Sequence, residues 1–362
     1  MTDKKGDGAP FPTFSSAERQ PSAAELPSLK QLKREDHASR LMEPPSYIFE
    51  YTPTEVLTSG REVFPEVQIE NDFQIETTRF NGGVFVRLPK MSGGDMFRRC
   101  QDAGALGLDK NNMISNFAMG DGVGQSINGK AASERATSLA LRELILSGDV
   151  SYTPSALKDV VKKVEERMQG FDIEELKLQW AQAILNKHSE NPRVVRRLLV
   201  PLGYGISSGK LEKKSTSHED EDIDNSLGST TLVVGKLEGS HIKMAYAGDG
   251  GFIIANSDRV KAFGGQHAEV KAPAQLRLAG GKIDINQVQY FDIELSKGDM
   301  VLIYSDGLYC TAIGGEVSSE FRAKQVVSLI RSGNSVEQIV KSLTSDAAGG
   351  DDIEVLAFKY GG

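Results

Sequence analysis

Aspartate followed by glycine recurs along the chain, each time at the end of a short apolar run. The dipeptide closes the segments Phe117–Gly122, Met244–Gly250 and Val301–Gly307, and a further acidic pair, Asp351-Asp352, precedes the last apolar run. Carboxylates at strand ends, beside a glycine that lets the backbone come close, suit a hard, oxygen-ligated cation. One Asp-Gly pair alone is usually a turn. Four acidic clusters placed alike on separate apolar runs favour a divalent-cation site.

Other chemistries have weaker support in the sequence. Gly124–Ala131 matches a phosphate-binding loop except at Ala131, where that loop needs a serine or threonine hydroxyl to hold Mg²⁺. The same glycines could simply turn the chain into a helix. The acidic run that begins at Asp220 fails as a calcium loop, because Asn225 stands where glycine is required and Thr231 where a glutamate is required. None of the five histidines stands in a catalytic motif, so a Ser-His-Asp hydrolase has no support.

Composition excludes several classes of partner. The chain has 42 Lys and Arg against 50 Asp and Glu, a net charge of −8, which argues against binding nucleic acid or an anionic membrane. Apolar runs end well before the 18 residues of a membrane span. Cys100 and Cys310 are too few for a disulfide framework and lack zinc-site spacing. We expect a protein of the cytoplasm or nucleus; the sequence does not indicate its oligomeric state.

The 362 residues predict a tail and one large domain. Residues 1–45 are rich in Ser, Pro, Lys and Glu and are expected to be a disordered or loosely docked tail. Residues 46–362 are expected to form a single domain with a mobile acidic loop at about 204–227. Apolar periodicity and caps predict helices at 130–146, 154–169, 173–186, 193–200, 318–332 and 335–343. Alternation or short apolar runs predict strands at 73–77, 230–237, 241–248, 251–256, 290–295, 299–304 and 353–359.

The ordered motifs resemble those of the metal-dependent protein phosphatases of the protein phosphatase 2C class. The resemblance covers most of Phe73 to Tyr360, and the Asp-Gly-Val-Gly form is closest to the branch that lacks a histidine after the first Asp-Gly. The six motifs, in order, are Arg99-Cys100-Gln101-Asp102-Ala103, Asp121-Gly122-Val123-Gly124, Gly228-Ser229-Thr230-Thr231, Gly248-Asp249-Gly250, Ser305-Asp306-Gly307-Leu308 and Asp351-Asp352-Ile353.

The resemblance implies a fold and a set of site residues. The fold would be α+β, a four-layer αββα sandwich of two antiparallel sheets flanked by helices. Asp121 and Asp306 would be the catalytic residues, holding two Mg²⁺ or Mn²⁺ ions per site that activate a water for attack on phosphorus. The metal ligands would be Asp102, Asp121, the Gly122 carbonyl, Asp249, Asp306 and Asp351. Arg98 or Arg99 would bind phosphate, because a guanidinium can hold two phosphate oxygens.

The implied activity is hydrolysis of phosphoserine and phosphothreonine on phosphorylated protein substrates. Three positions depart from the family pattern: Gln101 replaces a frequent glutamate, Val123 replaces a histidine that acts as general acid, and Cys310 replaces an aspartate. These departures leave open a second interpretation, a pseudophosphatase that acts as a binding or regulatory protein. A nucleotide hydrolase built on Gly124–Lys130 is the third.

Overall fold

The computed structural model describes most of the second of two units into which the chain divides after Leu41. The described residues are 55–58, 66–70, 73–89, 100–123, 129–146, 152–169, 178, 181–182, 185, 191–199, 203–207, 210–213, 228–264, 275–277, 283–311, 315–348 and 350–361. The predicted tail, Arg98 and Arg99, most of the predicted helix at 173–186 and the acidic run at 218–222 lie outside them.

Two sheets form the centre of this unit. The six-stranded sheet has the order β1 (Glu55–Thr58), β5 (Ala103–Leu108), β6 (Ile114–Gly120), β10 (Leu232–Glu238), β11 (His241–Ala247) and β15 (Gln289–Glu294). The seven-stranded sheet has the order β13 (Val260–Gly264), β12 (Gly251–Ala255), β16 (Met300–Tyr304), β17 (Ile353–Lys359), β4 (Gly83–Leu88), β3 (Phe73–Phe80) and β2 (Glu66–Glu70).

The two predicted antiparallel sheets include one parallel pair, at the edge of the six-stranded sheet. Strand β1 pairs with β5 in parallel, whereas the other pairs within the two sheets are antiparallel. Between β1 and β5 the chain passes through β2, β3 and β4 of the other sheet. Such a long crossover, unlike a hairpin, can return the chain to its neighbour in the same direction.

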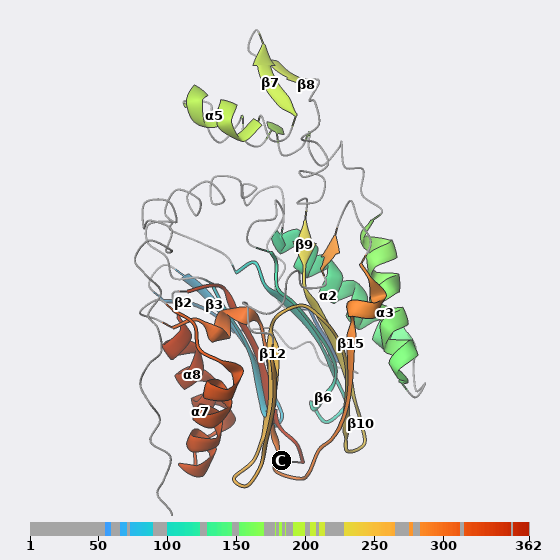
Figure 1. Cartoon of the computed structure of the whole chain (residues 1–362), viewed down its shortest axis with the longest axis vertical. Coiled ribbons are helices and arrows are strands. Elements are labelled where there is room, and N and C mark those ends of the chain that lie inside the picture. Colours follow the sequence, from blue (N-terminus) through green and yellow to red (C-terminus); the bar gives the residue numbers. More distant parts are fainter. Residues whose placement is uncertain are drawn as a thin grey trace, which may run out of the picture. The chain divides into compact units, whose positions relative to one another are not determined.

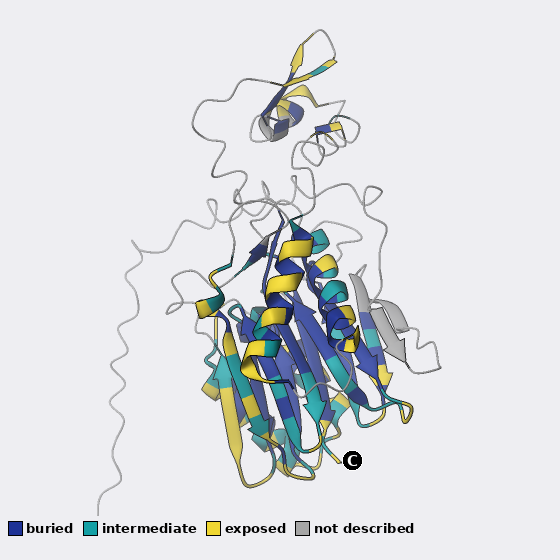
Figure 2. Ribbon diagram, turned by 90° about the vertical axis from the view of Figure 1, so that its right-hand side faces the viewer, coloured by how far each residue is buried: buried dark blue, intermediate teal, exposed yellow. Residues whose placement is uncertain are grey.

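Helices cover the outer face of each sheet, so the fold is the predicted α+β sandwich with four αββα layers (Figure 1). Helices α2 (Gly129–Leu146) and α3 (Pro154–Met168) pack on the six-stranded sheet, and α7 (Ser319–Arg331) and α8 (Val336–Ala347) pack on the other. Figure 2 shows the resulting pattern, with exposed outer helix faces above buried strands. Between the sheets lies an apolar core that includes Phe85, Phe117 and Phe252.

Local signals in the sequence fix where several helices begin. The Thr153 hydroxyl accepts a hydrogen bond from the Ala156 amide at 3.2 Å, and Pro154 occupies the first turn of α3, where its missing N–H costs nothing. Ser335 and Gln338 form a reciprocal capping box at the start of α8. These helices begin within one residue of their predicted starts, as does α5 (Pro192–Leu199).

Two short strand pairs complete the described elements. Strand β9 (Ser229–Thr230) pairs with β14 (Leu276–Arg277). Strands β7 (Tyr204–Ser207) and β8 (Lys210–Lys213) form a hairpin within the segment 204–227 that the sequence predicts as a mobile acidic loop, and residues 214–227 of that segment lie outside the described residues. Tyr204 is buried, and β7 packs with α5, so this segment has the apolar anchor that a loop lacks. No helix in the described part of the chain is both long and apolar enough to cross a membrane.

Candidate metal centre

Strand register brings the predicted acidic residues to one end of the sandwich. In the six-stranded sheet Ala103 pairs with Gly120, so Asp102, which precedes β5, lies beside Asp121, which follows β6. In the other sheet Tyr304 pairs with Val355, so the end of β16 that leads to Asp306 lies beside the start of β17. Segments far apart in the sequence therefore meet because antiparallel neighbours place the end of one strand beside the start of the next.

Two groups of ligand atoms result. Oxygens of Asp121, Asp249 and Asp306, all half-buried, lie within 4.8 Å of one another. A second group joins Asp102, Asp352 and the thiol of Cys100, again within 4.8 Å and all buried. Carboxylates from both sheets thus converge at one site.

The surroundings of Asp102 give the strongest indication of a cation site. Its side chain is fully buried, yet neither carboxylate oxygen has a hydrogen-bond partner among the described residues. A buried carboxylate normally needs hydrogen bonds or a counter-charge, because leaving it without them costs several kcal/mol, on the order of the desolvation penalty of an ion. Its oxygen-rich surroundings fit Mg²⁺ or Mn²⁺.

The electrostatics of the metal-free protein agree with this assignment. Burial, then the charge of Asp352, raises the pKa of Asp102 well above its ordinary value. Burial, then the charges of Asp102 and Asp306, does the same to the pKa of Asp121. Groups that repel one another in this way gain most from a shared divalent cation.

The Gly-Ser-Thr motif holds the backbone of the Asp121 loop. The Asp121 amide donates to the Thr231 hydroxyl at 3.0 Å, and the Thr231 amide donates to the Asp121 carbonyl at 2.9 Å. The Thr230 hydroxyl donates to the same carbonyl at 2.9 Å, and the Val123 amide donates to the Ser229 carbonyl at 3.0 Å. The motif therefore positions the backbone of Asp121.

Two glycines of the Asp-Gly pairs are required by close backbone contacts. A Cβ at Gly122 would lie 2.6 Å from the Gln101 carbonyl oxygen and 2.7 Å from the Gly129 carbonyl carbon. A Cβ at Gly307 would lie 1.8 Å from the Asp352 carbonyl oxygen. Any larger residue would push apart the segments that carry Asp121, Asp306 and Asp352.

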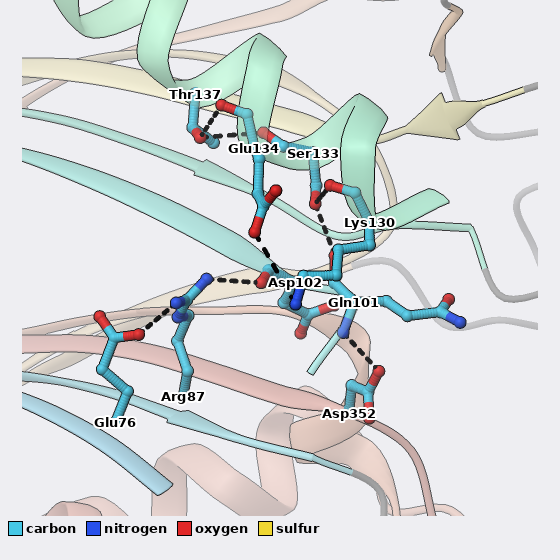
Figure 3. A network of polar contacts seen from close by, with 9 residues as sticks. All are labelled: Glu76, Arg87, Gln101, Asp102, Lys130, Ser133, Glu134, Thr137 and Asp352. Carbon is cyan, nitrogen blue, oxygen red and sulfur yellow. Dashed lines mark hydrogen bonds and ion pairs between the residues drawn. The ribbon is translucent and has the colours of Figure 1, made fainter. Parts of the chain in front are cut away.

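Arg87 and helix α2 hold the segment that carries Asp102 (Figure 3). Arg87 is buried, pairs with Glu76, and donates from Nη1 to the Asp102 carbonyl at 2.9 Å. The Ser133 hydroxyl on α2 donates to the Gln101 carbonyl at 2.5 Å. Figure 3 also shows the Gln101 side-chain amide pointing away from the Asp102 carboxylate.

Asp351 is close to the site but belongs to neither group. It is exposed, its Oδ1 accepts a hydrogen bond from the Asp352 amide at 2.9 Å, and its charge contributes to the raised pKa of Asp121. Asp351 as a ligand remains a prediction. Nothing in the sequence alone marks Asp352 or Cys100 as ligands, although both lie inside the motifs that contain Asp351 and Asp102. Cys310 lies outside both groups and packs against Gly350.

Comparisons with known proteins yield solved structures at low identity. No family model and no curated protein matches the chain. PppA, a key regulatory component of T6SS in Pseudomonas aeruginosa, is 16% identical, with 76% of this chain and 96% of that one covered and a TM-score of 0.43. RsbX in complex with magnesium is 15% identical, covering 82% and 100%, with a TM-score of 0.42. The catalytic domain of the serine/threonine protein phosphatase PstP in complex with two manganese ions is 14% identical, covering 76% and 96%, with a TM-score of 0.41. Similarity at this level assigns no activity to this chain.

Proposed function

We propose that the protein is a metal-dependent phosphatase of the protein phosphatase 2C class, which hydrolyses phosphoserine and phosphothreonine on proteins. The observation that carries the proposal is the convergence of Asp121, Asp249 and Asp306 beside the buried, unpartnered Asp102. Each of these residues comes from a different one of the ordered motifs. If each Asp-Gly pair were only an independent turn, there would be no reason for these carboxylates to lie together.

The proposed ligands of Mg²⁺ or Mn²⁺ are Asp102, Asp121, the Gly122 carbonyl, Asp249, Asp306 and Asp351. When bound, such ions act as Lewis acids toward phosphoryl oxygens and lower the pKa of bound water, which allows direct hydrolysis without a phosphoenzyme. Arg98 and Arg99 are proposed to bind the substrate phosphate. We place the protein in the cytoplasm or nucleus, acting on phosphorylated proteins.

The chain's own residues prepare this site before substrate arrives. Hydrogen bonds from Thr230 and Thr231 fix the backbone of Asp121, and Arg87 fixes that of Asp102. Val123, in the Asp121 loop, has no proton to give to the departing serine oxygen. In the proposed branch, with Asp-Gly-Val-Gly, water therefore supplies that proton.

The test measures hydrolysis of an aryl phosphate and a phosphoserine peptide with Mn²⁺, with Mg²⁺ and with chelator. We expect turnover only with a divalent cation, and no hydrolysis of ATP. Asp121→Ala should lower turnover by about 10³-fold or more, since Asp121 is proposed to be a ligand of both cations and its loss would forfeit several kcal/mol of charge stabilisation.

Asp292→Ala is the matched control. Asp292 is an exposed carboxylate that pairs with His241 at 2.7 Å on β15, outside both groups of ligand atoms. It should leave turnover unchanged. If the wild-type protein binds Mn²⁺ but hydrolyses neither substrate, the pseudophosphatase interpretation is correct; if ATP is the preferred substrate, the nucleotide hydrolase is.

A further inference from the structure

Cys100 introduces a sulfur ligand into an otherwise oxygen-rich site. We propose that Cys100, Asp102 and Asp352 bind a thiophilic divalent cation, such as Zn²⁺, Cd²⁺ or Co²⁺, at a position separate from the Asp121–Asp249–Asp306 group. The proposed binding site consists only of residues that the structure describes. Its consequence for turnover, given below, also rests on the proposed function.

The three side chains already share one small buried space. The Cys100 sulfur and one oxygen from each aspartate lie within 4.8 Å of one another, and the exposed fractions are 8% for Cys100, 0% for Asp102 and 5% for Asp352. Metal–sulfur and metal–oxygen bonds are about 2.3 Å and about 2.0–2.2 Å in zinc sites, so modest side-chain rotations would bring all three atoms to bonding distance. Within the described part of the chain, both buried oxygens of Asp102 are without hydrogen-bond partners, which is an independent sign that this space suits a cation.

Surrounding backbone contacts hold the three ligands in place. The Gln101 amide donates to Asp352 Oδ2 at 2.8 Å, and Arg87 Nη1 donates to the Asp102 carbonyl at 2.9 Å. The Cys100 sulfur lies 3.7 Å from the Leu88 carbonyl oxygen, to which its S–H donates. The site is therefore positioned by β4, the start of β5 and the start of β17.

Sulfur decides which cation this position prefers. Thiolate is a soft ligand that favours Zn²⁺, Cd²⁺ and Co²⁺, whereas Mg²⁺ prefers oxygen. On binding, the S–H bond breaks, its proton leaves to solvent and a sulfur–metal bond forms, with no change of oxidation state. The bound cation would offset the charges of the two carboxylates and the thiolate, because the nearby Arg87 guanidinium is already paired with Glu76.

Cobalt provides a direct readout of the sulfur ligand. Titration of the metal-free full chain with Co²⁺ should produce a near-ultraviolet thiolate-to-cobalt charge-transfer band. Cys100→Ser should abolish this band, and Cys310→Ser, the matched control at the only other cysteine, should retain it. The proposal is overturned if the wild type gives no band, if Cys100→Ser keeps it, or if only Cys310→Ser loses it.

Calorimetry with Cd²⁺ tests Asp352 together with the Cys100 thiol. Cd²⁺ affinity should fall about tenfold or more in both Cys100→Ser and Asp352→Asn, at least as much as removing an outer partner of a metal ligand does. Thermal unfolding without metal checks that each variant is folded, and added Zn²⁺ should raise the melting temperature of the wild type more than that of Cys100→Ser. Equal Cd²⁺ affinities in wild type and Cys100→Ser would contradict the site.

Asp102 is a proposed ligand both of the thiophilic cation and of Mg²⁺ or Mn²⁺, so the two kinds of cation should compete. If Asp102 also serves the Mg²⁺ or Mn²⁺ site, Zn²⁺ should inhibit Mn²⁺-dependent turnover, with about tenfold weaker inhibition in Cys100→Ser. The two proposals fail separately. Turnover without a cobalt band removes only the thiophilic site, and a cobalt band without turnover removes only the phosphatase.

Discussion

Asp102 and Asp299 have the same side chain and the same complete burial, but their surroundings are opposite. Asp299 precedes β16, and its carboxylate is bonded by the Arg259 guanidinium, by the Ser296 amide at 2.8 Å and by Asn256 Nδ2 at 2.6 Å. Burial raises the pKa of Asp299, but these hydrogen bonds outweigh it and the net shift is downward. Among the described residues neither carboxylate oxygen of Asp102 has a hydrogen-bond partner at bonding distance, and burial, then the charge of Asp352, raises its pKa.

The difference teaches how to separate a structural buried charge from a functional one. The fold supplies every partner that Asp299 needs, so this carboxylate ties the loop before β16 to the end of β12. At Asp102 the fold supplies repulsion from Asp352 and Asp306 instead. Such an arrangement costs stability in the metal-free protein and is accounted for by the cation that the site is proposed to bind.

The largest effect on stability is expected at the satisfied carboxylate. Asp299→Ala removes the shared acceptor of the Ser296 amide, the Asn256 side chain and the Arg259 guanidinium at a buried position and should lower the free energy of unfolding by about 2 kcal/mol. Urea unfolding measures this. Asp292→Ala, which breaks only an exposed pair, should change stability by less than about 1 kcal/mol. Equal changes in the free energy of unfolding for Asp299→Ala and Asp292→Ala would show that the partners of Asp299 do not make it a stabilising buried carboxylate.

A smaller effect is expected in the pH dependence of the metal-free protein. Because the pKa values of Asp102 and Asp121 are raised on folding, the folded chain keeps protons that the unfolded chain loses as pH rises past the ordinary aspartate value. Their contribution to stability therefore falls with rising pH until the raised values are passed. Asp299 acts in the opposite sense, contributing stability above its ordinary pKa that is lost as pH falls.

Urea unfolding in chelator, from about pH 3 to about pH 8, tests both signs. Asp102→Asn should reduce the loss of stability at the higher pH, whereas Asp299→Asn should reduce the loss on the acid side. Saturating Mn²⁺ should restore stability at high pH in the wild type. If the metal-free wild type and Asp102→Asn show the same change in stability from acid to neutral pH, the Asp102 carboxylate does not destabilise the folded protein and this part of the account is wrong.

The smallest expected effect concerns the missing general acid at Val123. A general acid contributes about 10²–10⁴-fold where it is fully positioned, so Val123→His, placed in a loop shaped for valine, should raise the rate on a phosphoserine peptide by about tenfold. An aryl phosphate, whose leaving group needs little protonation, should gain less. Kinetics on the two substrates near neutral pH decide this. Equal gains on the two substrates would mean that protonation of the leaving oxygen does not limit the rate of the wild-type protein.

Much of the fold could be predicted because its signals are local. Residues next to one another in the sequence determine where two helices begin: Thr153-Pro154 starts α3, and Ser335 caps α8. Strand β5 escaped prediction, since Ala103–Leu108 is rich in glycine and alanine and is buried throughout, so it shows no alternation. The parallel pairing of β1 likewise depends on a crossover between sheets that no local pattern encodes.

The candidate site could be predicted in part for the same reason. Recurring Asp-Gly pairs indicate Asp121, Asp249 and Asp306 as candidate ligands, and the structure brings these three residues together. The pairing of Asp352 with Cys100 and Asp102 depends on how β17 meets β4 and β5, which spacing along the chain does not reveal. The requirement for glycine at position 307 is also not visible in the local sequence, because a Cβ there would collide with the carbonyl oxygen of Asp352, which is distant along the chain.

Direct measurement of Mn²⁺ binding tests the central claim, that carboxylates at these strand ends hold divalent cations. Equilibrium titration followed by the electron paramagnetic resonance of free Mn²⁺ gives stoichiometry and affinity without relying on turnover. We predict two tightly held ions per chain in the wild type and in Asp292→Ala, and loss of both in Asp121→Ala, because two cations repel without a carboxylate shared between them. Unchanged stoichiometry and affinity in a folded Asp121→Ala protein would contradict the account.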